Sequence, residues 1–357
     1  MFDLEAIKQA KSQREIPTDD TEGGVPYIVQ STSNNMFARN VNKNWLIENN
    51  EAPVSGNRIV LGVTLPAVSY QPREFGASQV ITAKADWLNE RRGNFVAIVI
   101  SKLMYQFSYA RKPGLQIYKD MRIKLPTKNS EIDFAFMESF IAELEAERIA
   151  ELEAYLVDGG LKDYTLTKEE TKALAEFEKQ EFSPFNVIEV LNVKNTKNIL
   201  SRDIVENSGE TPYLGASADN NSVSSYIAYD EQHLDKGNCV FIGGKTFVVS
   251  YQEKDFYSND SHNLVLYLKD EEKQSKVNYL YLAACINKSL KHKYSWGDSI
   301  SNKKIQKDTV TLPAQNDQPD YEKMETFISA IQKLVIKEVV LYADQKIAAT
   351  QKVVSVN

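Results

Sequence analysis

Short apolar runs separated by turn-forming residues occupy two long stretches of the chain. They lie at residues 25–125 and 212–312 and include "RIVLGV", "FVAIVI", "CVFIGG", "FVVSY" and "NLVLYL". The runs are rich in β-branched and aromatic residues, and Gly, Pro and Asn interrupt them, a pattern typical of strands joined by turns. Each stretch is therefore predicted to fold as a mixed α/β domain.

The pattern changes after a Leu-Pro pair at the end of each stretch, where apolar residues recur at helical spacing. This spacing predicts one amphipathic helix over residues 131–158 and another over residues 319–350. Asp133 and Asp320 stand where they can cap the first turns of these helices. A helix of about 25 residues is about 37 Å long, so each is predicted to act as a spacer.

The apolar stripe of each predicted helix needs a partner, and the simplest partner is the other stripe. Because the two halves follow one another in sequence, the helices are predicted to form an antiparallel coiled coil. The residues expected at this interface, or at an interface with a partner protein, are Met137, Ile141, Leu144, Leu152, Met324, Ile328, Ile331 and Val335.

Three sequence blocks occur twice in the same order, which indicates a duplicated module. The pairs are "GGVPYIVQSTSNN" (23–35) with "GETPYLGASADNN" (209–221), "GNRIVLGVTLPAVSYQPREF" (56–75) with "GNCVFIGGKTFVVSYQEKDF" (237–256), and "LPTKNSEIDFAFMESFIAEL" (125–144) with "LPAQNDQPDYEKMETFISAI" (312–331). The predicted organisation is a domain at 1–130, its helix at 131–158, an acidic linker at 159–182, a second domain at 183–318 and its helix at 319–350.

Composition narrows the class of protein. Of the 357 residues, 42% are hydrophobic and 25% are charged, which is ordinary for a globular protein of two domains. No apolar run is long enough to span a bilayer, and "MFDLEAIKQAKSQRE" lacks the apolar core of a signal peptide, so a cytoplasmic protein without membrane association is expected. The two cysteines and three histidines lack ligand spacing, so no metal site is expected.

Charge is distributed unevenly along the chain. Residues 131–182 contain 15 acidic and 5 basic residues, whereas residues 1–130 contain 17 basic and 12 acidic residues. Basic residues gather late in each domain and alternate with aromatic residues such as Tyr105, Tyr109 and Trp296. Fixed positive charge beside planar side chains suits contact with nucleic acid. A solvated lysine face is the alternative interpretation of either cluster.

The repeated blocks resemble a known family. The Gly-x-x-Pro-Tyr entry with its downstream Asn-Asn, the Gly-Asn to Val-Ser-Tyr-Gln segment, and the Leu-Pro ending before a long Met-Glu-(Ser/Thr)-Phe-Ile helix carry the resemblance. They are similar to the target recognition domains and conserved helices of DNA specificity subunits. Such subunits belong to type I restriction-modification systems and to the related type IIB enzymes, and the resemblance covers essentially the whole chain.

The resemblance implies a clamp on double-stranded DNA, in which each domain reads one half of a bipartite, asymmetric target and the helices set the distance between halves. It implies no catalytic residue and no cofactor in this chain. A partner adenine-N6 DNA methyltransferase that uses S-adenosylmethionine would perform the chemistry, and a nuclease or translocase subunit would be a further partner. An alternative interpretation is a duplicated protein-interaction scaffold without DNA-reading activity, which the net charge of −7 leaves open.

Candidate DNA-binding residues follow from side-chain chemistry. Asparagine suits bidentate contact with adenine, and Lys and Arg suit phosphate or guanine. The Asn pairs also fit turn formation, the tyrosines also fit a core position, and two glycines before Lys245 allow close approach of the backbone to DNA. The candidates are Asn34, Asn35, Thr64, Tyr70, Arg73, Lys102, Arg111 and Lys112 in the first domain, and Asn220, Asn221, Lys245, Thr246, Tyr251, Lys254, Lys291, Lys293, Lys303 and Lys304 in the second.

Overall fold

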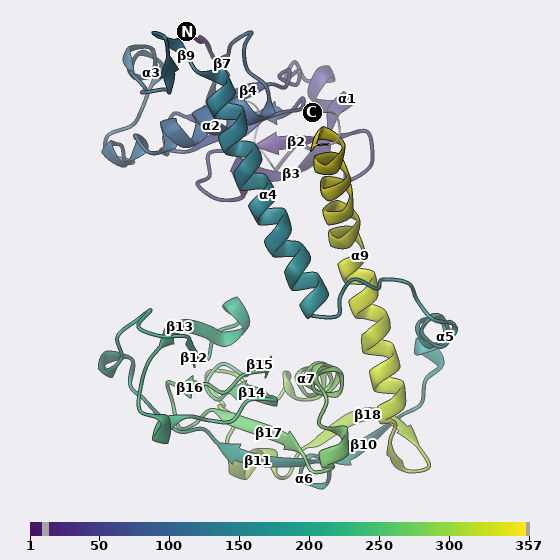
Figure 1. Cartoon of the computed structure of the whole chain (residues 1–357). Coiled ribbons are helices and arrows are strands. Elements are labelled where there is room, and N and C mark those ends of the chain that lie inside the picture. Colours follow the sequence, from purple (N-terminus) through teal and green to yellow (C-terminus); the bar gives the residue numbers. More distant parts are fainter. Residues whose placement is uncertain (9–13, 355–357) are drawn as a thin grey trace. The chain divides into compact units, whose positions relative to one another are not determined.

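The computed structural model describes residues 1–8 and 14–354. They form two compact units (Figure 1). One is Met1–Glu153 together with the end of the last helix from Thr350, and the other is Ala154–Ala349. Among the described residues, no helix is both long enough and apolar enough to cross a membrane.

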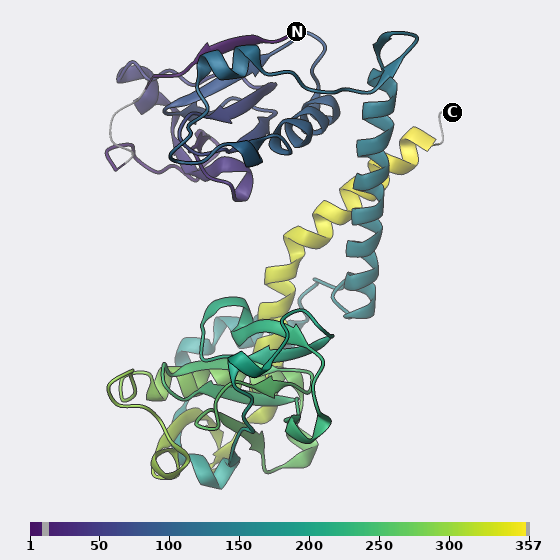
Figure 2. The same ribbon diagram turned by 90° about the vertical axis from the view of Figure 1, so that its left-hand side faces the viewer.

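The first unit is a mixed α/β domain that continues into a long helix. Its strands are β1 (Asp3–Ala6), β2 (Gly24–Ile28), β3 (Phe37–Asn42), β4 (Arg58–Gly62), β5 (Val68–Gln71), β6 (Gly76–Ala77), β7 (Val80–Lys84), β8 (Thr127–Lys128) and β9 (Glu131–Ile132). Its helices are η1 (Asn34–Met36), α1 (Lys43–Glu48), α2 (Glu90–Ser101), η2 (Met104–Gln106), α3 (Leu115–Asp120) and α4 (Phe134–Asp158). The main sheet has the antiparallel order β1-β7-β4-β5 and contacts α2 (Figure 2), and a smaller sheet has the order β3-β2-β6.

The second unit has the same kind of core with additional elements. Its strands are β10 (Phe182–Asn186), β11 (Leu191–Asn195), β12 (Thr211–Leu214), β13 (Val223–Ile227), β14 (Cys239–Gly243), β15 (Val248–Gln252), β16 (Tyr257–Ser258), β17 (Leu264–Leu268), β18 (Thr309–Gln315) and β19 (Gln318–Pro319). Its helices are α5 (Lys168–Ala175), η3 (Phe177–Lys179), α6 (Val187–Val190), η4 (Ser201–Asp203), η5 (Asp219–Ser222), η6 (Glu231–His233), η7 (Glu271–Lys273), α7 (Lys276–Leu290), α8 (Asn302–Ile305) and α9 (Tyr321–Val354). The sheets have the orders β11-β17-β14-β15, β13-β12-β16 and β10-β18-β19.

The sheet orders confirm the predicted duplication of a mixed α/β domain. The order β1-β7-β4-β5 corresponds strand by strand to β11-β17-β14-β15, and β3-β2-β6 corresponds to β13-β12-β16. One sequence prediction is wrong, because "FVAIVI" belongs to α2 and not to a strand. Val96, Ala97 and Ile100 form the buried face of α2 there. A short apolar run fits a buried helix as well as a buried strand, so periodicity alone could not separate them.

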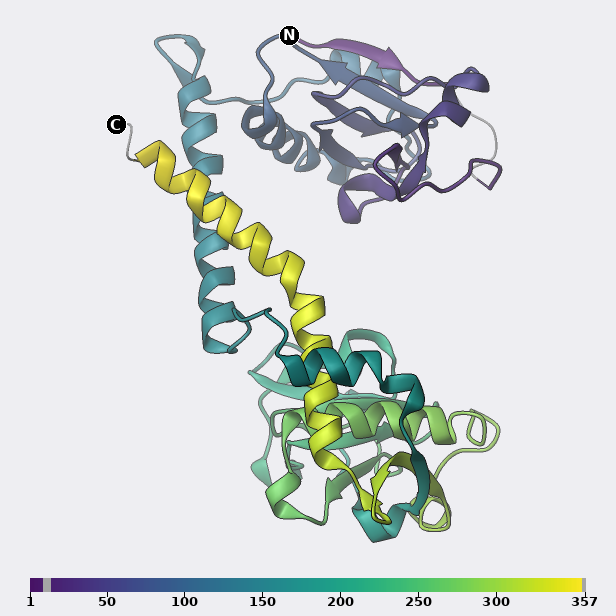
Figure 3. The same cartoon turned by 90° about the vertical axis from the view of Figure 1, so that its right-hand side faces the viewer.

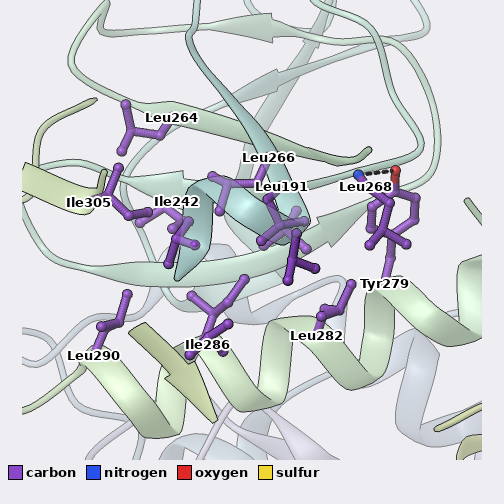
Figure 4. Close-up of a cluster of buried hydrophobic side chains, with 14 of the residues drawn as sticks. Leu191, Ile242, Leu264, Leu266, Leu268, Tyr279, Leu282, Ile286, Leu290 and Ile305 are labelled. Atoms are coloured by element: carbon purple, nitrogen blue, oxygen red, sulfur yellow. Dashed lines mark hydrogen bonds between the residues drawn. The ribbon is translucent and has the colours of Figure 1, made fainter. Parts of the chain in front are cut away.

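The core of the second domain lies between α7 and the main sheet (Figure 4). Tyr279, Leu282, Ile286 and Leu290 recur at three- and four-residue spacing along α7, and all four are fully buried. The Tyr279 hydroxyl accepts a hydrogen bond of 3.0 Å from the backbone N–H of Leu268. Burial of each such side chain contributes about 1.5–3 kcal/mol, so this helix fixes the sheet that carries the loops.

Both long helices begin where the sequence places their caps. Asp133 Oδ1 accepts the N–H of Phe136 (2.9 Å), and Asp320 Oδ1 accepts the N–H of Lys323 (3.1 Å), which confirms both predicted caps. Helix α4 starts at Phe134 and α9 at Tyr321, close to the predicted starts at 131 and 319.

The first turns of α4 pack against α2 of the same domain. The Phe95 ring makes edge contacts with Phe136 and Phe140, with ring centres 6.3 and 5.8 Å apart. Arg92 forms an ion pair of 2.9 Å with Glu138. The start of α4 is therefore fixed to the first domain by apolar and ionic contacts together.

The structure corrects two of the predicted helix-interface residues. Met324 is fully buried in the core of the second domain, and Ile328 packs against that core, so the first turns of α9 belong to the domain. The remaining residues differ in exposure. Met137 and Ile141 are buried, Leu152 and Ile331 are half-buried, and Leu144 and Val335 are exposed. Their role in pairing the long helices stays a prediction.

The acidic linker between α4 and β10 is folded onto α9 (Figure 3). The ring of Phe177 stacks on that of Phe327 with 4.4 Å between ring centres. The buried carboxylate of Glu170 accepts hydrogen bonds from the Ser329 hydroxyl and from Lys333 Nζ (3.0 Å). The linker thus forms part of the second unit.

Candidate nucleic-acid interface

A partly buried hydrogen-bond network explains why the Asn-Asn and Tyr-Gln pairs of the first domain recur in the second. Asn35 Nδ2 donates to the Tyr70 carbonyl (3.2 Å), and Gln71 Nε2 donates to the Asn35 carbonyl and to Ser69 Oγ (both 3.0 Å). The Tyr70 hydroxyl donates to Asn57 Oδ1 (2.8 Å). These contacts tie the turn after β2 to strand β5.

The second domain contains the same network at the equivalent residues. Asn221 Nδ2 donates to the Tyr251 carbonyl (2.9 Å), and Gln252 Nε2 donates to the Asn221 carbonyl (2.8 Å) and to Ser250 Oγ (2.9 Å). The Tyr251 hydroxyl donates to Asn238 Oδ1 (3.1 Å). The repeated Asn-Asn and Tyr-Gln pairs therefore form the same hydrogen bonds in both domains.

The structure favours the turn interpretation of the Asn pairs and the core interpretation of the tyrosines, and contact of the Asn side chains with DNA stays a prediction. The four residues Asn34, Asn35, Asn220 and Asn221 all have positive φ, between 46° and 50° for three of them and 52° for Asn221, a conformation that asparagine tolerates better than most residues. Asn34 Nδ2 and Asn220 Nδ2 also donate to backbone carbonyls three residues ahead, at 3.2 and 3.1 Å. Tyr70 and Tyr251 are buried. These side chains are occupied in shaping turns.

Replacement of Asn35 or of Asn221 by Ala should lower the free energy of unfolding of its own domain by about 1–2 kcal/mol, because buried partners lose a donor. Hydrogen exchange followed by mass spectrometry resolves the two domains and measures both effects. Asn192→Ala, at an exposed position of β11, is the matched control and should change little. A shift in DNA target without loss of protection would restore the base-reading interpretation.

The segment between α2 and α3 exposes aromatic and basic side chains together. Tyr105 and Tyr109 are 86% and 70% exposed. Lys112 Nζ lies 4.4 Å from the ring centre of Tyr109. Lys102, Arg111 and Lys112 are exposed, and within the described part of the chain none of them forms an ion pair. We define residues 102–114 as the first basic loop, which can meet phosphates without breaking an ion pair.

The segment between α7 and β18 is its counterpart in the second domain. Trp296 is 76% exposed, and Lys291 and Lys303 are exposed without an ion pair among the described residues. We define residues 291–304 as the second basic loop. The recurrence of an exposed basic and aromatic loop at the same place in both domains favours a binding surface over a solvated lysine face.

Two lysines of the second basic loop hold the loop itself. Lys293 Nζ lies 2.8 Å from Oδ1 of the buried Asp308, which also accepts a hydrogen bond from the Tyr294 hydroxyl. Burial and this hydrogen bond raise the pKa of Tyr294, so its hydroxyl stays protonated. Lys304 pairs with Asp298. Lys293 and Lys304 therefore already have acidic partners within the domain, and their contact with DNA stays a prediction.

Lys245 is also neutralised within its own domain. Its ammonium lies 2.9 Å from Asp260 Oδ2, and His262 Nδ1 lies 2.7 Å from Asp260 Oδ1. Burial alone would raise the pKa of Asp260, but the His262 N–H and the two side chains outweigh it and lower the pKa from its usual 3.8 to about 2. A phosphate would therefore compete with Asp260 for Lys245.

The turn at Thr246 and its counterpart at Thr64 are built differently. The Thr246 hydroxyl donates to the Ala216 carbonyl (2.7 Å). The Thr64 backbone N–H instead donates to Gln30 Oε1 (2.6 Å). The predicted reading role of these two residues gains no support from these contacts, but the two domains present different surfaces at equivalent turns.

The ion pair of Asp260 should make the second domain sensitive to acid. Because the folded pKa lies below the unfolded one, the carboxylate contributes stability above pH 4 that is lost as pH falls toward 2. We expect Asp260→Asn to remove on the order of 2 kcal/mol at neutral pH and to abolish this part of the acid dependence. Urea unfolding between pH 2 and 7 measures it. An unchanged slope in the variant would show that other carboxylates govern acid unfolding.

Arg73 and Lys254 occupy equivalent tight turns. A Cβ atom on Gly56 would lie 2.5 Å from the Pro72 carbonyl oxygen, and one on Gly237 would lie 2.3 Å from the Lys254 carbonyl carbon. Only glycine permits such an approach. Both basic side chains are exposed and form no ion pair in the described ranges, so both remain candidates for phosphate contact.

Three exposed aromatic residues were not among the candidate DNA-binding residues predicted from the sequence. Tyr105, Tyr109 and Trp296 enter the sequence argument only as neighbours of basic residues, yet all three project from the basic loops. An aromatic residue between two Lys or Arg residues outside the apolar periodicity is the signal that could have identified them. No group of three or more His, Cys, Asp or Glu residues that could hold a metal ion occurs in the described part of the chain.

Comparisons with known proteins agree with this geometry. A sequence model of the type I restriction modification DNA specificity domain matches residues 1–154 and again residues 179–341. The type II restriction enzyme BgcI specificity subunit S.BcgI from Heyndrickxia coagulans is 21% identical over 349 residues, covering 94% of this chain and 93% of that protein.

Two solved structures align with most of this chain. The S subunit of a Type-I restriction-modification system from M. genitalium aligns with a TM-score of 0.57 and 13% identity, covering 99% of this chain and 91% of that one. The HsdS subunit from Thermoanaerobacter tengcongensis aligns with a TM-score of 0.33 and 12% identity, covering 92% and 85%. The first of these likenesses shows a shared fold.

Proposed function

We propose, because the chain belongs to the family of type I restriction modification DNA specificity domains, that its two domains each read one half of a bipartite, asymmetric DNA target. Membership makes target recognition in a restriction-modification complex the role of the chain and leaves catalysis to other subunits. The exposed basic loop at the same place in both domains is the observation that carries the proposal. Exposed basic side chains in these loops can bind DNA phosphates. Because the turns at Thr64 and Thr246 differ between the domains, the two half-sites are expected to differ in sequence.

The partners belong to the same proposal. We infer an adenine-N6 DNA methyltransferase that uses S-adenosylmethionine, together with a nuclease or translocase subunit, in the cytoplasm. Support comes from the family of the chain and from its likeness to the specificity subunit of a restriction enzyme. Helices α4 and α9 would pair as an antiparallel coiled coil, and their length suits a spacer between two half-sites about one DNA turn apart.

Co-expression of the chain with its neighbouring methyltransferase tests the proposal. Sequencing of methylated adenines should show one motif with two defined halves and an unspecified spacer, and the methyltransferase alone should show none. Mobility shift on random duplex provides a second readout. An assembled complex that neither shifts DNA nor methylates any adenine would favour the protein-interaction scaffold.

A further inference from the structure

The two domains differ at one edge of their shared architecture. In the second domain β10 pairs antiparallel with β18, with Phe185 opposite Val310 and Ser183 opposite Leu312. The counterpart of β18 in the first domain runs through residues 121–128, and its last two residues form β8. Among the described residues no strand pairs with residues 121–126. The first domain therefore has an open edge where the second has β10.

The open edge is already shaped as a strand. Met121, Ile123 and Leu125 are half-buried against the first-domain core, whereas Arg122 and Lys124 between them are exposed. This alternation is that of a strand with one buried face. The counterparts of Ile123 and Leu125 in β18 are fully buried, so the added strand in the second domain completes their burial.

An apolar cavity of about 320 Å³ lies beside the open edge. It is lined by Phe2, Leu61, Ala83, Ile100, Tyr118 and Ile123 among others. The strand registers place Ala83 opposite Ile59 and Leu266 opposite Val240, so Ala83 is the counterpart of Leu266. Figure 4 shows that Leu266 packs in the filled core of the second domain at this place. A smaller side chain accounts for part of the cavity.

The segment that covers the equivalent place in the second domain shows what would fit. In β10 and α6, Phe185 packs against the core and Val187 is fully buried in it. Glu181 and Glu189 flank these residues. Around the open edge, the exposed residues Lys119, Arg122 and Lys124 supply positive charge. An extended segment with apolar residues at every second position and acidic ends is complementary to this site.

We propose that the open edge and its cavity are an acceptor site for an extended, acidic segment of a partner protein, which adds a strand to residues 121–126 and places an apolar side chain in the cavity. Strand addition supplies main-chain hydrogen bonds, and the pocket supplies specificity. An unpaired edge beside an apolar cavity is otherwise a liability for aggregation. The inference does not depend on the DNA-reading function.

A labelled peptide with the sequence "EFSPFNVIEV", taken from residues 181–190, is the probe. Fluorescence anisotropy with the full chain should show saturable binding. Ala83→Leu, which copies the second domain and fills the cavity, should weaken binding at least about tenfold. Ala38→Leu, the same exchange on an exposed position of β3, should bind as the unchanged protein does. A peptide with Ser in place of Phe185 and Val187 should not bind.

Two further outcomes decide the assignment. Hydrogen exchange should slow at the amides of residues 122–125 when the peptide is bound, and absence of protection would overturn strand addition. Equal binding to the Ala83→Leu and Ala38→Leu variants would overturn the site. Self-association of the chain that the peptide blocks would assign the site to a second copy and overturn its assignment to a different partner.

Discussion

Arg111→Glu combined with Lys112→Glu should weaken DNA binding by the assembled complex about 100-fold at physiological salt, because phosphate contacts dominate affinity. Apart from their contacts with the rings of Phe107 and Tyr109, these two side chains form no ion pair or hydrogen bond in the described part of the chain, so the change should leave the domain folded. Each lost phosphate contact should also reduce the slope of log K against log salt by about 0.9. Fluorescence anisotropy on duplex DNA at several salt concentrations measures both quantities.

A control with the same change in charge elsewhere distinguishes loss of contacts in the first basic loop from the effect of the overall net charge. Lys168→Glu with Lys172→Glu makes the same change of charge on exposed positions of α5. This control should weaken binding only slightly, because salt screens distant charges. If both double variants lose affinity equally, the first basic loop is not a DNA contact.

Lys333→Met should markedly lower the free energy of unfolding of the second unit. Glu170 is 5% exposed, and without Lys333 its carboxylate stays buried without a counter-ion, which costs several kcal/mol. Burial raises the pKa of Glu170, but the Ser329 hydroxyl, the Thr167 N–H and Lys333 outweigh it and the pKa is lowered. Stability from this carboxylate is therefore present above pH 4.5 and is lost as pH falls. Urea unfolding at pH 7 and pH 4 measures the loss.

Two variants control this result. Lys337→Met removes an exposed lysine from the same helix and should have little effect. Adding Glu170→Gln to Lys333→Met should recover part of the stability, because the uncompensated charge is gone. A Lys333→Met protein as stable as the unchanged one would mean that the linker does not depend on this ion pair.

Much of the scaffold could be predicted because it is local or repeated. Asp133 and Asp320 cap the long helices, since the distance from an N-cap to the third residue ahead is fixed by helix geometry. Asn35 and Asn221 suit turns of positive φ, and their recurrence marked equivalent places in two domains. Periodicity defined α4 and α9 to within a few residues.

The sequence could not predict which lysines form ion pairs within the folded domain. Lys245, Lys293 and Lys304 carry the residue type that phosphates need, but their partners are acids brought near by the folded loops. The choice of partner depends on tertiary positions that spacing along the chain does not fix. The same reason explains why the position of Met324 was predicted wrongly. Its spacing fits an interface between helices, but its side chain lies in the core of the second domain.

Helix α9 is built into its domain at more than one level. Met324 lies in the core, and further along the helix Lys333 is bonded to the linker through Glu170. A torque applied to α9 after Lys333 would not rotate the helix alone. Such a rotation would break both the packing of Met324 in the core and the ion pair of Lys333 with Glu170. The second domain would rotate together with α9, so a rotation imposed on the helix would change the orientation of the second basic loop.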